Sequence, residues 1–210
     1  MQMATDTEPI QDTSNLGVAK GRPGGYSMVA PAGTDLTALK DVSKTIKELI
    51  QTVAGARSLG YISEDGVTFS TDTDTNDNSE WGGNVVDSSL SKYAESAQVT
   101  FLESRKAVLD SFYGDGNVTV SGATTEIRHN ERFTDPHVYV FDAVVSATKV
   151  KRSIIPLGRI FERDDVSENS SDMMGYTPTI KCMPYDGYDG DAYRDYIYDT
   201  KKAASANAGA

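Results

Sequence analysis

The stretch AQVTFLESRKAVLDSFYG, residues 97–114, sets the pattern for the rest of the chain. In its first part Ala97, Val99 and Phe101 are apolar and the residues between them are polar. A period of two is typical of a strand with one face in a core and the other in water. We therefore expect a strand within residues 93–103.

The second part of this stretch predicts a short helix directly after the strand. Ser104 can cap the first turn, and Val108, Leu109 and Phe112 recur at the spacing of one helix face. Gly114 can end the helix, because glycine readily takes the left-handed conformation found after many helices. A strand that runs into a short helix indicates a sheet with a helix packed on its side.

Further strands are predicted on both sides by β-branched and aromatic residues between turn signals. They are expected at residues 59–70, with a turn at Glu64-Asp65-Gly66, and at 117–121, 124–133, 137–145, 147–161 and 174–185. Pro156 and Gly158 interrupt one of these runs, so we expect it at a sheet edge rather than at the centre. Seven or eight strands and two helices predict a mainly β fold, an antiparallel β-barrel or sandwich with a flanking short α-helix.

The other predicted helix lies nearer the N-terminus, over residues 35–54. Thr34 or Asp35 can cap it, and it would end near Gly55. Its apolar residues recur every three or four positions. They are Leu36, Leu39, Val42, Ile46, Leu49, Ile50 and Val53.

Charge and cysteine content exclude several classes of protein. The 210 residues include 20 Lys and Arg against 31 Asp and Glu, a formal net charge of −11. This is the wrong sign for a protein that grips nucleic acid phosphates. Cys182 is the single cysteine, so no disulfide within the chain and no cysteine zinc site can form. No apolar run is long enough to span a bilayer, and residues 1–15 lack a signal-peptide pattern, so we expect a soluble protein made in a cytoplasm.

The same composition predicts one domain with two loose ends. Residues 1–27 are rich in polar residues, Gly and Pro and are expected to form a flexible arm. Residues 28–200 show no linker and are expected to form a single β-domain, with a flexible tail over 201–210.

Motifs for metal binding or catalysis are weak. The run Asp72-Thr73-Asp74-Thr75-Asn76-Asp77 resembles the start of a calcium loop, but its sixth position is not glycine and its twelfth, Gly83, is not glutamate. His129 and His137 lie in neighbouring predicted strands without evident partners, and each is expected to be half exposed. We expect no cofactor, no metal site and no catalytic residue.

Several segments together resemble a known family. They are residues 30–36, 59–67, 80–83, 99–104 with 107–109 and 113–114, 152–160 and 174–185. In this order they are similar to the major tail tube protein of long, non-contractile-tailed bacteriophages. Two departures stand out: Thr37 occupies a position where the family has proline, and the predicted helix over residues 35–54 is longer than usual.

The resemblance implies a structural virion protein rather than an enzyme. Members of this family form hexameric rings that stack into the tail tube, through which the genome passes into the host. The implied partners are other copies of the chain, the tape measure protein, the distal tail (tail tip) protein and the tail terminator. Genomic DNA would pass without specific binding, no membrane is implied, and assembly would take place in the host bacterial cytoplasm.

For contacts between rings we expect the arm of residues 1–25 and a polar loop over residues 71–81. The loop is too polar for a core and too long for an idle turn. Its candidate interface residues are Asp72, Asp74, Asn76, Asp77, Glu80 and Trp81.

Two other functions stay open from the sequence. A β-sandwich binding module for a host carbohydrate or protein would use the tyrosine-rich stretch of residues 185–198 as its contact patch, although these rings could equally cover the core edge. An enzyme that works through carboxylates with His129 or His137 ranks third.

Overall fold

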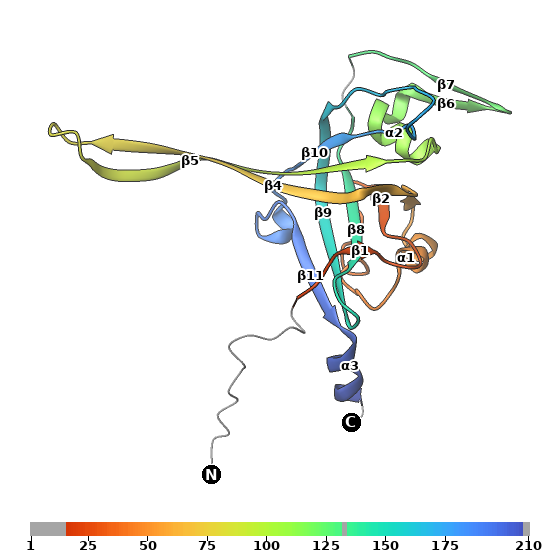
Figure 1. The fold of residues 1–210 in the computed structure, drawn as a ribbon, viewed down its shortest axis with the longest axis horizontal. Coiled ribbons are helices and arrows are strands. Elements are labelled where there is room, and N and C mark those ends of the chain that lie inside the picture. The colour runs from red at the N-terminus through yellow and green to blue at the C-terminus, as the bar shows by residue number, and fades with distance from the viewer. Residues whose placement is uncertain (1–15, 132–133, 208–210) are drawn as a thin grey trace, which may run out of the picture.

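The computed structural model describes residues 16–131 and 134–207, and it is mainly β (Figure 1). The strands in the described part are β1 (Lys20–Gly21), β2 (Ser27–Pro31), β3 (Arg57–Ser58), β4 (Ile62–Ser79), β5 (Val85–Phe101), β6 (Val118–Ser121), β7 (Thr124–Ile127), β8 (His137–Val144), β9 (Lys149–Arg163), β10 (Pro178–Cys182) and β11 (Arg194–Asp199). The helices there are α1 (Ile46–Thr52), α2 (Lys106–Tyr113) and α3 (Thr200–Asn207), with short 3-10 turns at Asp115–Asn117 and Asp186–Tyr188.

The main sheet is antiparallel throughout and runs in the order β3-β2-β8-β9-β10-β5-β4. β1 also pairs with β8, and β11 also pairs with β9, while β6 and β7 form a separate small hairpin. The predicted mainly β, antiparallel fold is therefore confirmed.

Strand β8 shows how this sheet separates two hydrophobic cores. Val138 and Val140 face a core that also contains Leu39, whereas Tyr139 and Phe141 face the other core. Because both faces of the strand are buried, its sequence is a nearly continuous apolar run rather than an alternating one. The sheet thus has packing layers on both sides at this point.

Helix α2 covers one of these cores, as the opening stretch of sequence predicts. Ala97, Val99 and Phe101 are buried, and so are Val108, Leu109 and Phe112 of the helix. The expected cap at Ser104 is wrong: Arg105 occupies the N-cap position, and the Ser104 hydroxyl lies 3.0 Å from the Tyr176 hydroxyl. Gly114 does end the helix, with a positive φ of 99°.

The helix predicted over residues 35–54 is much shorter in the structure. Only Ile46–Thr52 is helical, starting from a capping box in which Thr45 and Glu48 bond each other's backbone N–H groups. The predicted apolar residues are nevertheless inside: Leu36, Leu39 and Leu49 are all buried.

Two arginines account for the irregular segment before α1. Arg152 donates hydrogen bonds to the backbone carbonyls of Leu39, Asp41 and Lys44, and Arg22 donates to those of Val42, Ser43 and Lys44. In a helix these carbonyls would accept from the backbone N–H four residues later. The guanidinium groups satisfy them instead, so this segment keeps turns rather than a helix.

The strand-turn-strand predicted over residues 59–70 is also wrong. β4 runs without a reversal from Ile62 to Ser79, and the ladder with β5 jumps from Ile62↔Phe101 to Val67↔Val99. Glu64-Asp65-Gly66 forms the irregular residues of this jump, with Gly66 at a φ of 72°. A glycine there allows a bulge within one long strand.

β9 is a central strand, contrary to the edge position expected from Pro156 and Gly158. It pairs with β8 on one side and with β11 and then β10 on the other. The registered partners on that second side change from β11 at Ile154 to β10 at Gly158, and the ladder with β8 has a bulge at the same place, so Pro156 sits where the pairing is interrupted. Gly158 is required there because a Cβ would lie 2.6 Å from the Tyr139 ring.

Parts of both predicted flexible ends belong to the structure. Lys20–Gly21 pairs with β8, and residues up to Asn207 continue β11 as helix α3. The remainder of the predicted arm, residues 1–15, lies outside the described residues. The strand expected at residues 174–185 is confined to Pro178–Cys182.

Candidate interaction surface

β4 and β5 leave the sheet together as a long two-stranded hairpin (Figure 1). β10 flanks β5 only from Gln98 to Glu95, and beyond that point the hairpin continues to a turn at residues 80–84. The loop predicted over residues 71–81 is therefore a strand up to Ser79. The prediction that these residues stay out of the core is confirmed, since residues 70–94 are exposed.

The candidate interface residues all lie on this hairpin. Asp72, Asp74, Asn76 and Asp77 are in β4, while Glu80 and Trp81 are in the turn. The Glu80 carboxylate accepts a hydrogen bond of 2.8 Å from the Asn84 side chain, which helps to lower the pKa of Glu80. Trp81, the one tryptophan of the chain, is fully exposed at the tip.

One side of the hairpin is acidic and polar. From Val67 to Ser79, β4 is regular, so its even-numbered residues share a side. We call the side formed by Asp72, Asp74, Asn76, Asn78 and Asp87 the acidic face. Its cross-strand contacts agree with this register: Lys92 bonds Asp72 at 2.5 Å and Asn78 bonds Asp87 at 3.1 Å.

The opposite side carries large apolar side chains. Thr73 pairs with Tyr93, Thr75 with Leu90 and Ser79 with Val85, and paired residues in an antiparallel ladder point to the same side. We call the side formed by Thr73, Thr75, Val85, Leu90 and Tyr93 the apolar face. The exposed fractions of Tyr93, Leu90 and Val85 are 60%, 61% and 57%.

Two bulges in β5 determine which of its residues point to each side. β5 has an extra residue at Ser91 and another at Val86, whereas β4 has none over the same length. Each extra residue shifts the register by one, so Tyr93 and Leu90, three residues apart, still point to the same side. Asp77 is the acid of the apolar side, where it accepts a hydrogen bond of 2.5 Å from Ser88.

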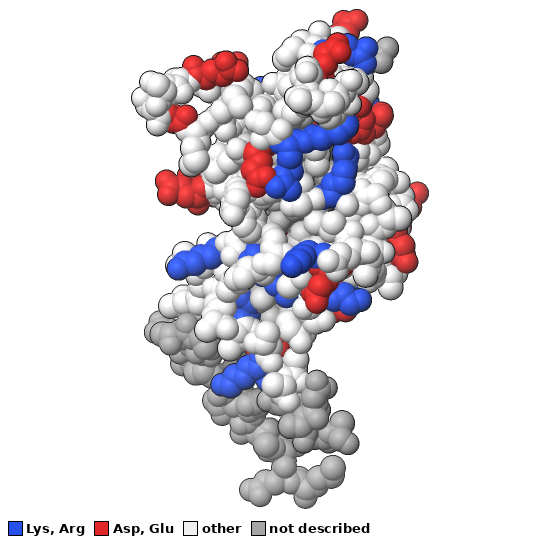
Figure 2. Space-filling view, turned by 90° about the vertical axis from the view of Figure 1, so that its right-hand side faces the viewer, with Lys and Arg blue, Asp and Glu red and all other residues white. Residues whose placement is uncertain are grey.

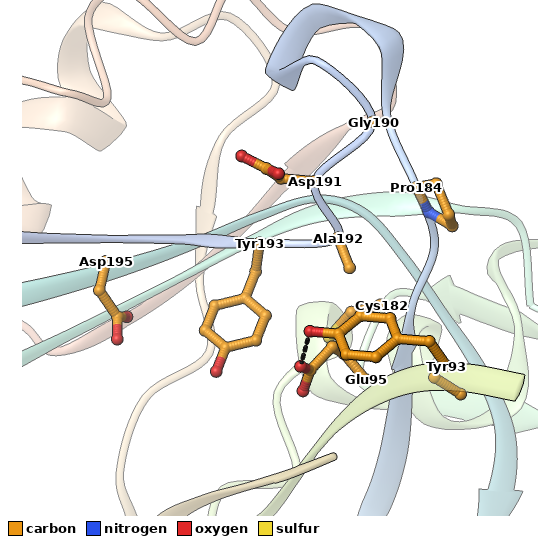
Figure 3. Close-up of a pocket in the computed structure, with 10 residues that line it drawn as sticks. Tyr93, Glu95, Cys182, Pro184, Gly190, Asp191, Ala192, Tyr193 and Asp195 are labelled. Atoms are coloured by element: carbon orange, nitrogen blue, oxygen red, sulfur yellow. Dashed lines mark hydrogen bonds between the residues drawn. The ribbon is translucent and has the colours of Figure 1, made fainter. Parts of the chain in front are cut away.

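A pocket of about 410 Å³ lies at the root of the apolar face (Figure 3). In it the Glu95 carboxylate lies between the rings of Tyr93 and Tyr193, and Tyr93 donates a hydrogen bond to it. That hydrogen bond raises the pKa of Tyr93, while burial and the nearby carboxylates raise the pKa of Tyr193. Asp191 and Asp195 also line the pocket, where they pair with Arg194 and Lys151, so the pocket is a polar site rich in carboxylates rather than an apolar one.

The two histidines are held in different surroundings. His137 is buried rather than half exposed. Its imidazole has polar partners there, since it lies 3.0 Å from the Asp115 carboxylate and 2.8 Å from the Asp135 carbonyl. His129 is exposed, with its ring 4.9 Å from that of Tyr113. Among the described residues no group of three or more His, Cys, Asp and Glu is placed to hold a metal ion.

The tyrosine-rich stretch packs mainly against the core. Tyr188 is fully buried, Tyr185 and Tyr196 pack against the same core, and Tyr193 stacks on Phe69 with ring centroids 5.0 Å apart. This arrangement favours core cover over the contact patch of a binding module.

The sequence predicts an exposed loop over residues 71–81, whereas the structure has a hairpin there with an apolar face that the sequence does not indicate. Val85, Leu90 and Tyr93 are spread among serines and acids, so they do not form a visible hydrophobic run. The alternation of threonine at 71, 73 and 75 with aspartate at 72 and 74 is the signal that could have indicated a strand.

The hairpin and the opposite side of the molecule differ in charge. Figure 2 shows that opposite side, where Lys and Arg side chains gather across the middle of the surface.

Within the described residues, no helix has the length and apolar character to cross a membrane.

Comparison with protein-family models gives a match over most of the chain. The family model described as "Phage tail tube protein" matches residues 22–207, which includes both cores and the hairpin. No curated protein matches the chain.

Proposed function

Because the chain belongs to the phage tail tube protein family, a structural component of the virion tail, we propose that it assembles into stacked hexameric rings that form the tube. Residues 28–200 act as the tube-forming β-domain. The tube is the conduit through which the genome is ejected into the host. Such a role is structural, not enzymatic.

The observation that carries this proposal is the projecting hairpin. A two-stranded hairpin is at best marginally stable in water unless another surface covers it. Residues 72–94 reach beyond the body of the domain and expose Tyr93, Leu90, Val85 and Trp81. A neighbouring ring would supply the missing surface, with Asp72, Asp74, Asn76, Asp77, Glu80 and Trp81 in or beside the contact.

Growth of a tube also follows from having unlike ends. The hairpin projects from one side, while Lys and Arg gather on the opposite side (Figure 2). A contact between two different surfaces of the same chain is heterologous, and where it does not close into a ring it repeats without limit along an axis. The length must then be set by other proteins, and we assign this to a tape measure protein, with a distal tail protein at one end and a terminator at the other.

The net charge suits passage of DNA. At −11 per copy, each ring of six would carry a large negative charge. Acidic surfaces repel phosphates within about 10 Å at moderate salt. We propose that DNA passes through the lumen without specific binding.

The test is electron microscopy of the purified full-length protein, together with sedimentation over a range of concentrations. Rings or tubes with a central channel are the expected result. Protein that stays monomeric at every concentration, including after addition of preformed tail tips, would overturn the proposal. An incubation with duplex DNA at physiological salt should give no retarded band.

A further inference from the structure

We infer that the apolar face of the hairpin is buried against a second copy of this chain, while the acidic face stays in contact with water. This rests on the proposed function, since it names which side of the hairpin makes the contact between copies. The residues concerned are Thr73, Thr75, Val85, Leu90 and Tyr93 on the buried side.

The first argument is the free-energy cost of removing each face from water. Tyr93, Leu90 and Val85 are more than half exposed in the single chain, and removing them from water is favourable. Asp72, Asp74 and Asp87 carry charge, and burying a carboxylate is unfavourable unless a cation and hydrogen bonds accompany it. Lys92 is the one basic side chain in this part of the hairpin and already pairs with Asp72. The apolar face can be covered at lower cost, because Asp77 is the one acid on that side between Tyr93 and Val85.

The second argument is that two carboxylates of the acidic face already accept hydrogen bonds from side chains of the hairpin. Asp72 accepts from Lys92, Asp87 accepts from Asn78, and the face needs no further donor to lie in water. On the side of the apolar face, Glu95 accepts hydrogen bonds from Thr71 and Tyr93 at the root, and Asp77 accepts one from Ser88 between Leu90 and Val85. The other side chains of the face are apolar or threonine.

Charge complementarity identifies the occupant as a second copy. Two acids give this side of the hairpin a negative charge: Asp77, which lies between Leu90 and Val85, and the pocket residue Glu95 at the root. The outer side of β9 and β10 offers the matching surface on the same chain. There the exposed Phe161 ring lies 5.1 Å from the Arg159 guanidinium and 5.6 Å from the Lys181 ammonium.

Met183, two residues after Lys181, is 36% exposed and extends that receiving surface, while Phe161 is 38% exposed. An aromatic ring flanked by two cations is complementary to apolar side chains flanked by carboxylates. Because the two surfaces differ, one copy can offer its hairpin and receive another at the same time.

Two neighbouring residues provide a matched test. Leu90 lies on the apolar face and Ser89, which pairs with Asn76, lies on the acidic face, and both are exposed. The variants Leu90→Cys and Ser89→Cys of the full-length protein are labelled with a maleimide, first as free chains and then in assembled tubes. The natural Cys182 is buried and adds little background.

On assembly we expect labelling at position 90 to slow at least about tenfold, and labelling at position 89 to change less than about twofold, because thiol reactivity requires access. Equal labelling at position 90 in free chains and tubes would overturn the face assignment, and it would also leave the apolar face free for a different partner. Protection at position 89 with free reaction at 90 would reverse the two faces.

A charge introduced at the same two positions gives a second readout. Leu90→Asp should raise the concentration needed for tube formation at least about tenfold, because it places an unpaired carboxylate in the contact. Ser89→Asp should assemble like the wild type. If both variants have the same unfolding midpoint as the wild type, the substitutions do not affect folding. Normal tubes from Leu90→Asp would overturn the inference alone, whereas a wild-type protein that forms neither rings nor tubes would overturn the proposed function.

Discussion

Arg152 and Asp142 form a two-pronged ion pair in which both side chains are completely buried. The Arg152 Nε–Asp142 Oδ1 distance is 2.6 Å and the Nη2–Oδ2 distance is 2.7 Å. The remaining guanidinium N–H groups donate to the carbonyls of Leu39, Asp41 and Lys44, so all five donors are used. Arg22, at the end of the N-terminal segment, adds a second cation at 2.9 Å from Asp142.

Replacing Arg152 with methionine should lower the free energy of unfolding by about 3–5 kcal/mol. The change removes the closer partner of a buried carboxylate and the side-chain donor of the Leu39 carbonyl, while the Asp41 carbonyl keeps the Lys44 N–H and the Lys44 carbonyl keeps Arg22. Urea unfolding followed by circular dichroism measures the difference. Arg22→Met is the matched control, because Arg22 is slightly exposed and Asp142 would keep Arg152; we expect a loss of about 1–2 kcal/mol. Equal losses in the two variants would contradict this ranking.

The His137–Asp115 pair should make stability depend on pH. Burial alone would lower the pKa of His137, but the hydrogen bond and the charge of Asp115 outweigh burial and raise it. A group whose pKa is raised by folding stabilises the folded state below its unfolded pKa, near 6.5, and loses that contribution as pH rises through the folded value. The urea midpoint of the wild type should therefore fall between about pH 6 and pH 8.

His137→Gln should flatten this part of the pH profile, because the replaced side chain no longer titrates. His129→Gln is the control and should keep the slope, since His129 is exposed and contacts Tyr113 through its ring. The imidazole NMR signals of the two variants identify which histidine titrates with a raised pKa. A midpoint that rises with pH over this range would contradict the assignment.

Cys182 should be nearly inert in the folded protein. Its side chain is buried in the core next to the pocket, and burial raises the pKa of its thiol to about 12. At pH 8 almost no thiolate is present, and the thiol is out of reach of reagents. Reaction with a chromogenic disulfide should be at least about a hundredfold slower in buffer than in urea. A rapid reaction in buffer would show that the root of the hairpin opens.

Burial was easier to predict from the sequence than conformation. Leu36, Leu39 and Leu49 were correctly expected inside, because apolar spacing reports which residues leave water. The same spacing suggested a helix, yet the carbonyls of this segment are bound by an arginine 108 to 113 residues away in sequence. A local sequence pattern cannot reveal a contact over this distance along the chain, and this contact produces the turns.

At the candidate site the error is the reverse, because a regular strand was expected to be irregular. The polarity of residues 71–81 predicts that they are exposed, but it also predicts a loop, whereas residues 71–79 are part of strand β4. A strand that projects from a domain has no core face to produce a hydrophobic alternation, so only the weaker alternation of threonine and aspartate remains. Pairing with β5, and with it the apolar face around Leu90, depends on residues that the sequence does not mark as partners.

Shortening the hairpin should separate folding from assembly. Thr73 lies directly opposite Tyr93, so an Asn-Gly turn can replace residues 74–92 and join the two strands. Phe69 and Ala97, which contact the core, lie below the cut. The shortened protein should unfold within about 1 kcal/mol of the wild type, because a solvent-exposed two-stranded ribbon adds little stability. It should also form no tubes by electron microscopy, having lost Leu90 and the turn with Trp81. Tubes of normal width from this variant would show that copies meet through other surfaces, and a chain that fails to fold would show that the hairpin supports the domain itself.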